Sequence, residues 1–169
     1  KIHFIINHWP SRRGGETKSR PKRIKAAKLT KHLSDSLFVE DPYSKIIIMG
    51  DFNDDPTSPS IKKHLKAKGK KRGLDIKELF NPMEKIHKKG VGTLAWRDNW
   101  NLFDQIMISS ELTKTDYDSY QYYRAGIFNE SYLTVQKGRY KGYPFRSFVN
   151  GGYTGGYSDH YPVYLYLIK

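Results

Sequence analysis

Four apolar segments of the sequence begin or end in polar residues that could carry out chemistry. "GGYSDHYPVYLYLIK" places an acid and an imidazole directly before an apolar run, and "IIIMGDFND" ends a similar run in Asp-x-Asn. In "FIINHW" the apolar run is followed by Asn-His, and in "LFDQIMIS" an Asp lies near the start of the run. A carboxylate or imidazole buried without a partner is costly, so these groups must either face water or form a site. The residues concerned are Asn7, His8, Asp51, Asn53, Asp104, Asp159 and His160.

Each of these features has an ordinary structural explanation when it stands alone. Asp-x-Asn after a strand is common in turns, and a single histidine at a strand end is more often structural than catalytic. Asp51 and Asn53 lie two residues apart, so on an extended segment they point the same way. As a set, however, the residues exceed what turn chemistry requires, and the edges of open α/β sheets are where ligands bind. We therefore expect a functional site.

The residue types at these strand ends narrow the chemistry. The chain has no cysteine, no serine lies in a nucleophile-elbow motif, and "GGYTGG" lacks the lysine of a phosphate-binding P-loop. Carboxylate and amide oxygens are hard ligands that suit Mg²⁺, Mn²⁺ or Ca²⁺. A hard metal with paired His and Asp groups fits the hydrolysis of a phosphate ester.

The composition fits one domain with a strongly basic surface. The 169 residues are 37% apolar and carry 30 Lys and Arg against 17 Asp and Glu, which gives a net charge of +13. Such a surface attracts polyanions, namely nucleic acid, anionic lipid headgroups or phosphate-rich small molecules, although a lysine-rich surface can also serve solubility alone. No apolar run approaches the length of a membrane span. The absence of cysteine leaves the location open, with a slight preference for a secreted or periplasmic protein over a cytoplasmic one.

The pattern along the chain predicts strands alternating with helices. We expect strands over residues 1–7, 45–51, 92–96, 102–109, 120–128 and 162–168. A helix is expected from Pro21 to before Pro42, with Ala26, Leu29, Leu33 and Leu37 facing the core. A short helix is expected after Ser58, one or two helical turns over residues 74–80, and a loop over residues 138–156. This order predicts an α/β or α+β layered fold with a mixed β-sheet and flanking helices, in a single domain spanning residues 1–169.

Four segments, in this order, resemble the endonuclease/exonuclease/phosphatase family, which is DNase I-like: "INHWPSR", "IIIMGDFNDDP", "LFDQIMIS" and "GGYSDHYPVY". The resemblance extends from Lys1 to Lys169, and the turn "NWNLFDQI" looks like that of bacterial members. It implies a four-layer α/β sandwich, here in a partial version, and a Mg²⁺-dependent phosphodiesterase, nuclease or phosphatase. Its substrate would be a nucleic acid or a phospholipid or inositol phosphate headgroup.

The resemblance also implies roles for the first three motif residues. His8 looks like the family's general acid near the leaving group. Asp51 would orient or deprotonate the attacking water and contact the metal. Asn53 would hold a phosphate oxygen.

The remaining roles concern the later motifs and two flanking residues. Asp104 would orient His160, which would bind the phosphate and activate water, so either His160 or Asp51 could be the base. Asp159 would be a metal ligand, and Asn7 and Arg12 are candidate phosphate contacts.

Two departures from the family pattern shape the expectations. "NHWPSR" stands where abasic-site enzymes carry a tyrosine-containing motif, so the histidine favours the DNase, sphingomyelinase and 5-phosphatase branches and lowers the expectation of abasic DNA as the substrate. The family's main metal-binding Glu belongs to an earlier segment, so the chain is expected to be the C-terminal part of a bacterial member, with its N-terminal segment absent. On that basis the isolated chain would bind metal weakly, hydrolyse phosphodiesters poorly or not at all, and self-associate through an uncovered sheet. The alternative is a non-catalytic polyanion-binding module on the same fold.

Overall fold

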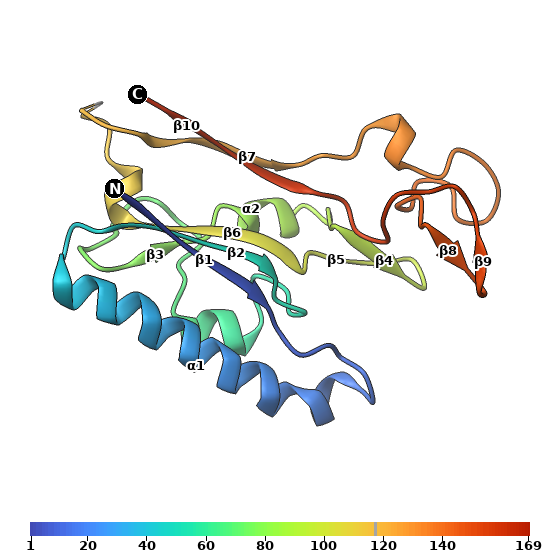
Figure 1. The fold of residues 1–169 in the computed structure, drawn as a ribbon, viewed down its shortest axis with the longest axis horizontal. Helices are drawn as coiled ribbons and strands as arrows, with labels where there is room; N and C mark the ends of the chain where they lie inside the picture. Colours follow the sequence, from blue (N-terminus) through green and yellow to red (C-terminus); the bar gives the residue numbers. More distant parts are fainter. Residues whose placement is uncertain (117) are drawn as a thin grey trace.

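A computed structural model describes residues 1–116 and 118–169, and its centre is a four-stranded mixed sheet (Figure 1). The sheet has the order β1-β2-β6-β3. Strand β1 (Ile2–His8) runs parallel to β2 (Lys45–Asp51), and β2 is antiparallel to β6 (Asp104–Ser109). The short strand β3 (Leu79–Phe80) pairs antiparallel to β6 at the far edge. The apolar runs found in the sequence supply the three long strands.

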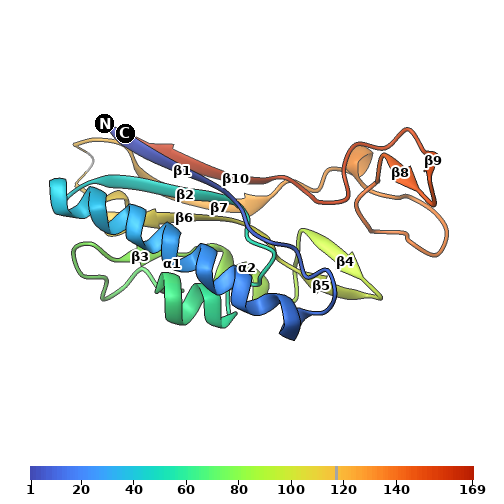
Figure 2. The ribbon, with the colours of Figure 1, turned by 60° about the horizontal axis from the view of Figure 1, so that its bottom comes forward.

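Helices cover one face of this sheet and a second, two-stranded sheet covers the other. Helix α1 (Glu16–Glu40) lies along the sheet beside the π-helix η1 (Ser60–Leu65), as Figure 2 shows. On the opposite face, β7 (Gln121–Ile127) and β10 (Val163–Ile168) form an antiparallel pair whose inner side chains pack on β2 and β6. The described residues thus form three layers, which confirms the expected α/β fold in a partial version of the sandwich.

Helix α1 differs from the prediction in its start and in its buried face. It begins at Glu16 rather than at Pro21, and Pro21 lies inside it near the N-terminal end, where the missing N–H costs a single hydrogen bond. Leu29 and Leu33, expected in the core, are 60% and 45% exposed. The helix is rotated because a buried arginine on it pairs with an acid in the chain after β2. The residues it buries are Ser19, Arg23, Ala27, Thr30, Ser34 and Phe38.

The connections differ from the prediction at two places. Residues 74–80 form turns and β3 rather than helical turns, because Leu79 and Phe80 pair with the free edge of β6. The predicted strand at 92–96 is β4 (Leu94–Trp96), which pairs with β5 (Asn99–Asn101) in a hairpin separate from the central sheet. The expected short helix after Ser58 is η1, and α2 (Met83–His87), η2 (Ser110–Thr113) and η3 (Ser131–Leu133) are further single turns.

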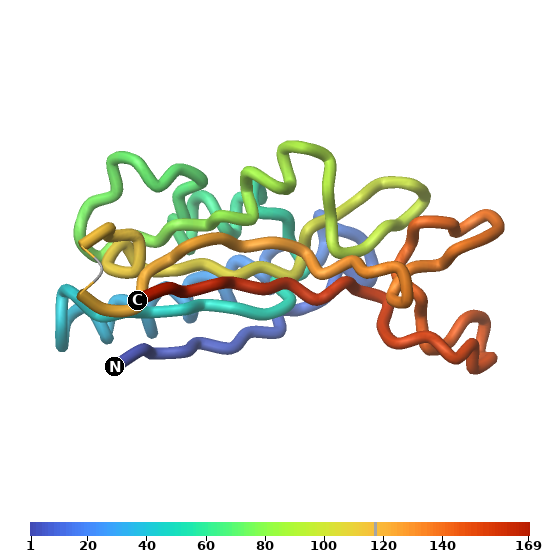
Figure 3. The backbone as a smooth tube through the Cα atoms, turned by 90° about the horizontal axis from the view of Figure 1, so that it is seen from above, coloured from blue at the N-terminus to red at the C-terminus, as the bar shows by residue number. Residues whose placement is uncertain are grey.

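The predicted loop at 138–156 extends beyond the sheet, as Figure 3 shows, and contains a small hairpin of β8 (Phe148–Val149) and β9 (Gly152–Tyr153). Both hairpins lie at the end of the sheet where β1 and β2 terminate (Figure 1). At the edge of the sheet, Phe4 and Ile6 of β1 are exposed, and self-association through this face stays a prediction. Within the described part of the chain, we found no helix with the length and apolar character needed to span a bilayer.

Candidate functional site

The register of the central sheet brings three of the predicted site residues side by side. His8 is the cross-strand partner of Asp51, and Asp51 is the partner of Asp104. Paired residues on neighbouring strands point to the same face. The three side chains therefore form a row across β1, β2 and β6, at the end of the sheet and on the face toward β7 and β10.

His160, just before β10, completes this row from the second sheet. Its Nδ1 lies 2.8 Å from Oδ2 of Asp104. Asp51, Asp104 and His160 each have a ligand atom within 4.8 Å of the others. His8 is exposed, and its Nε2 lies 3.7 Å from Oδ2 of Asp51. Motifs separated by more than 150 residues thus form one cluster of two acids and two imidazoles.

Gly50 and Asn53 fix the position of Asp51. At Gly50, φ is +134°, and a Cβ there would lie 1.9 Å from the carbonyl oxygen of Asn7, so this close approach of β1 and β2 needs glycine. Asn53 adopts φ of 50° and donates its backbone N–H to Asp51 at 2.8 Å. Its side-chain amide donates to Asp51 at 3.2 Å and to the carbonyl of Trp9 at 2.9 Å. In this structure both amide N–H groups of Asn53 hold the protein rather than face an open space.

The electrostatics of the cluster differ from those of ordinary surface groups. Burial raises the pKa of Asp51, and the neighbouring Asp104 raises it further, against the opposing effect of the Asn53 N–H. For His160, burial by itself lowers the pKa, but the hydrogen bond and charge of Asp104 outweigh it, and the pKa is raised. The site therefore combines a carboxylate that takes up a proton more readily than usual with an imidazole that keeps one.

Two predicted residues lie apart from this cluster. Asp159 is exposed and is not among the three groups within ligand distance, although its charge also contributes to the raised pKa of His160. Asn7 lies on the helix side of the sheet, where its Oδ1 accepts hydrogen bonds from Trp9 at 3.0 Å and Thr30 at 2.8 Å. Strand alternation places His8 and Asn7 on opposite faces.

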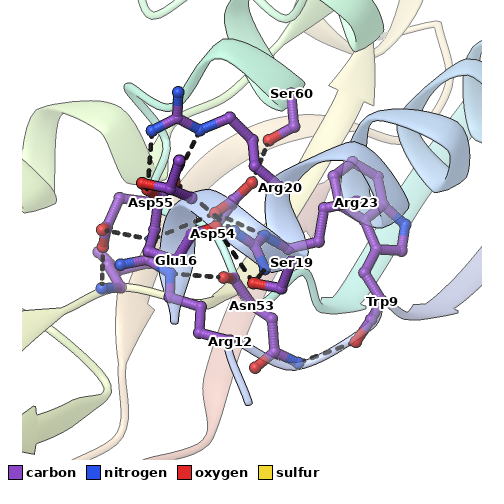
Figure 4. Close-up of polar contacts among 12 residues, drawn as sticks. Trp9, Arg12, Glu16, Ser19, Arg20, Arg23, Asn53, Asp54, Asp55 and Ser60 are labelled. Carbon is purple, nitrogen blue, oxygen red and sulfur yellow. Dashed lines mark hydrogen bonds and ion pairs between the residues drawn. The ribbon is translucent and has the colours of Figure 1, made fainter. Parts of the chain in front are cut away.

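Arg12 lies behind the site, in a network of ion pairs (Figure 4). It donates to the carbonyl of Asn53 at 3.0 Å and to the carboxylates of Asp54 and Asp55, each at 3.2 Å. Arg23 of α1 is fully buried, with Nε 2.8 Å from Asp54. Sequence reasoning missed Arg23, Asp54 and Asp55; the signal was present as two further acids directly after "GDFN".

Comparison with solved structures shows the fold. The chain superposes on a Bacteroides thetaiotaomicron mannosyl-6-phosphatase with a TM-score of 0.54 and 20% identity, covering 98% of this chain and 51% of that one. On D. rerio TDP2 humanized by 14 mutations, the chain superposes with a TM-score of 0.54 and 17% identity, covering 98% of this chain and 54% of that one. On the Xenopus laevis APE2 catalytic domain, the TM-score is 0.53 and the identity 14%, covering 97% of this chain and 49% of that one. The chain thus spans about half the length of these relatives.

The family comparison covers the whole chain. No curated protein matches it. A model of the Endonuclease/Exonuclease/phosphatase family matches residues 1–169. The chain belongs to the endonuclease/exonuclease/phosphatase family, with its DNase I-like fold.

Proposed function

We propose that this chain carries the acid–base part of a metal-dependent phosphoesterase site that hydrolyses a phosphate ester with an activated water. The observation that carries the proposal is the cluster of Asp51, Asp104 and His160, in which two acids lie together and, within the described residues, form ion pairs with histidines rather than with Lys or Arg. Family membership supports it, and so do the names of the superposed proteins, among them a phosphatase.

The geometry suggests a division of labour among the four groups. Asp104 occupies Nδ1 of His160 and favours the protonated ring, so His160 can stabilise negative charge on a phosphate oxygen through Nε2. Asp51, with its raised pKa, takes a proton from the attacking water as the new P–O bond forms. His8 returns a proton to the leaving oxygen as the old P–O bond breaks. We therefore assign the base to Asp51 rather than to His160.

The donor set at the site also fits a divalent cation. Asp51 and Asp104 would offer hard oxygen ligands, and Asp159 beside His160 could add a third, which suits Mg²⁺, Mn²⁺ or Ca²⁺. When bound, the ion would supply Lewis-acid polarisation of the phosphate. Three carboxylates leave much of an octahedral shell to water, substrate or other groups, so we expect weak binding by this chain alone.

The acid–base role is tested by a matched pair of histidine variants. We expect His160→Ala to lower the rate of hydrolysis of a chromogenic phosphodiester by about 10²–10⁴-fold. His87→Ala is the control, because His87 has a similarly exposed side chain, 23% against 22%, and lies 3.9 Å from Asp55. Equal rates for the two variants would refute the proposed site.

Metal dependence is tested by removal and by titration. EDTA should abolish hydrolysis and Mg²⁺ or Mn²⁺ should restore it. In calorimetric titration of the chain we expect weak binding that Asp51→Asn weakens further. Tight, stoichiometric binding that depends on Asp159 and not on Asp51 would contradict the assignment.

A non-catalytic polyanion-binding module remains the competing function, and the net charge of +13 favours it independently. A panel of DNA, RNA, sphingomyelin and sugar or inositol phosphates, each with and without EDTA, separates the two. Metal-dependent turnover of any member supports the enzyme. Binding of several polyanions with no turnover supports the module.

A further inference from the structure

A groove next to the candidate site is not explained by the acid–base chemistry. It has a volume of about 720 Å³ and lies between the β4–β5 hairpin and the chain from Val135 to Thr154. Figures 1 and 3 show both segments extending beyond the end of the central sheet. This volume is typical of a ligand-binding site.

The walls of the groove combine positive charge with flat aromatic rings. Four basic side chains and one acid line it, together with five aromatic residues. Trp96 is 63% exposed, and the guanidinium of Arg97 lies 5.7 Å from the centre of its ring. Arg139 lies 5.7 Å from the ring of Tyr140 in the same way. The basic residues are Arg97, Lys137, Arg139 and Arg146, and the aromatic residues are Trp96, Tyr140, Tyr143, Phe145 and Phe148.

The two walls are held together by specific contacts, so the groove is a built feature. The hydroxyl of Tyr143 donates to the carboxylate of Asp98 at 2.5 Å and accepts the Asp98 backbone N–H at 2.8 Å. This clasp holds a tight turn in which Arg97 and Asp98 both have positive φ, 49° and 63°. The one acid among the lining residues is therefore engaged by Tyr143.

The groove is also joined to the candidate site. Tyr161 follows His160 directly, and its backbone N–H donates to the carbonyl of Thr93 at the base of the β4–β5 hairpin, at 2.8 Å. Its hydroxyl donates to the carbonyl of Gly142 at 3.0 Å, in the opposite wall. The ring of Tyr161 stacks parallel to that of Trp100, with 6.3 Å between centres. A ligand in the groove would thus lie beside the segment that positions His160.

We infer that this groove binds single-stranded nucleic acid and presents a neighbouring phosphodiester to the site. The inference deepens the proposed function, on which it rests, by naming the substrate class. Single strands are bound by positively charged grooves whose aromatic rings stack on successive bases. Four cations spread over two walls suit several successive phosphates, and exposed rings such as Trp96 suit the bases between them. A sugar or inositol phosphate offers no aromatic face to stack.

A second basic cavity provides a contrast and a control. It measures about 480 Å³ and is lined by Lys71, Arg72 and Lys114 together with Asp75 and Glu111, with no aromatic ring among its described lining residues. Glu111 follows the end of β6, whereas Asp104 begins that strand. This cavity therefore lies at the opposite end of the sheet, where added acids reduce its positive charge.

The charge of the groove is tested by anisotropy of a fluorescein-labelled 12-nucleotide single strand, in EDTA so that no hydrolysis intervenes. We expect Arg97→Gln/Arg139→Gln/Arg146→Gln to weaken binding at least about 10-fold. The slope of log K against log salt should fall by about 2, since each lost phosphate contact on a single strand contributes about 0.7. The control Lys70→Gln/Lys71→Gln/Arg72→Gln removes the same charge at the far end and should bind nearly as well as the parent protein.

The stacking component is tested separately. Trp96→Ala should weaken binding about 5- to 100-fold, whereas Tyr123→Ala, which removes an equally exposed ring on β7, should have little effect. Unlabelled oligonucleotide should displace the probe far better than inositol hexakisphosphate at equal charge. Unchanged binding by Trp96→Ala, or equal displacement by the two competitors, would overturn the inference.

The two proposals can fail separately. A protein that binds the single strand through the groove but whose His160→Ala variant hydrolyses a phosphodiester as fast as the parent would refute the proposed function and leave the groove assignment intact. A protein that hydrolyses a phosphodiester but whose groove variants bind like the parent would refute the groove alone. Circular dichroism of each variant confirms that it is folded.

Discussion

Asp54 and Asp51 lie close together in the sequence, but their side chains have opposite kinds of neighbour. Asp54 is buried and lies between Arg12, at 3.2 Å, and Arg23, at 2.8 Å, with Ser60 donating to its second oxygen at 2.6 Å. Asp51, three residues earlier, has another acid, Asp104, as its cross-strand partner. An acid matched by cations of the chain stabilises the fold, whereas an acid beside another acid is left to bind a proton or an external cation.

Glu84 extends the comparison to a second matched acid. It is buried, and its two oxygens lie 2.8 Å from Nζ of Lys62 and 2.6 Å from Nζ of Lys88. Burial raises the pKa of Glu84, but the two lysines outweigh burial and lower it. For Asp51, burial outweighs the groups that lower its pKa, and the pKa is raised. The difference between the regions is therefore direct contact with Lys or Arg, more than the degree of burial.

The largest expected effect comes from removing a counter-charge. Arg23→Met should lower the free energy of unfolding by about 3 kcal/mol, the lower end for a broken buried pair, because Arg12 still contacts Asp54. Urea unfolding followed by circular dichroism measures it. Arg20→Met is the control, since Arg20 forms a partly exposed pair with Glu16 on the same helix, and its loss should destabilise the fold far less. Similar losses in the two variants would remove the distinction between the regions.

The next effect compares the two aspartates directly. Asp54→Asn should destabilise by about 2 kcal/mol, because two arginines then face an uncharged amide. Asp51→Asn should leave stability at neutral pH unchanged or slightly raised. A carboxyl whose pKa is raised on folding lowers the free energy of unfolding when it ionises. The uncharged amide of Asn removes that cost. Its hydrolytic activity should nevertheless be lost. A large destabilisation by Asp51→Asn would assign Asp51 to the structural group.

The smallest effect is a pH dependence at Glu84. Its pKa is lowered below the ordinary 4.5, so its contribution is fully present above pH 4.5 and is lost as the pH falls through the lower, folded-state pKa. Glu84→Gln should reduce stability by less than about 1 kcal/mol at neutral pH and flatten its decline in acid. Urea unfolding at a series of pH values tests this. Glu40→Gln, at the exposed end of α1, should show the same decline as the parent protein.

The local sequence pattern was enough to predict most of the long strands and several residues of the candidate site. The apolar runs predicted β1, β2, β6 and β10, and polar residues at their ends marked four of the groups that come together. Predictions from local pattern were wrong where a contact with a distant segment determined the structure. The leucines of α1 have helical spacing, yet the helix turns Arg23 inward because Asp54 lies there. Residues 74–80 have apolar residues that suit a helix, yet the open edge of β6 makes Leu79 and Phe80 a strand.

By itself the sequence determined the family, the layered fold and the residue types of the site, because these depend on runs and motifs within short segments. Tertiary structure alone decided which side of β1 faces the site, so that His8 joins Asp51 and Asn7 does not. It also decided that Arg12 neutralises Asp54 and Asp55 behind the site. The aromatic and basic groove forms between two loops that contacts such as that of Asp98 with Tyr143, 45 residues apart, hold together. Strand register, the pairing of acids with cations and the packing of loops all depend on contacts between segments that are distant in the sequence. A local pattern does not predict such contacts.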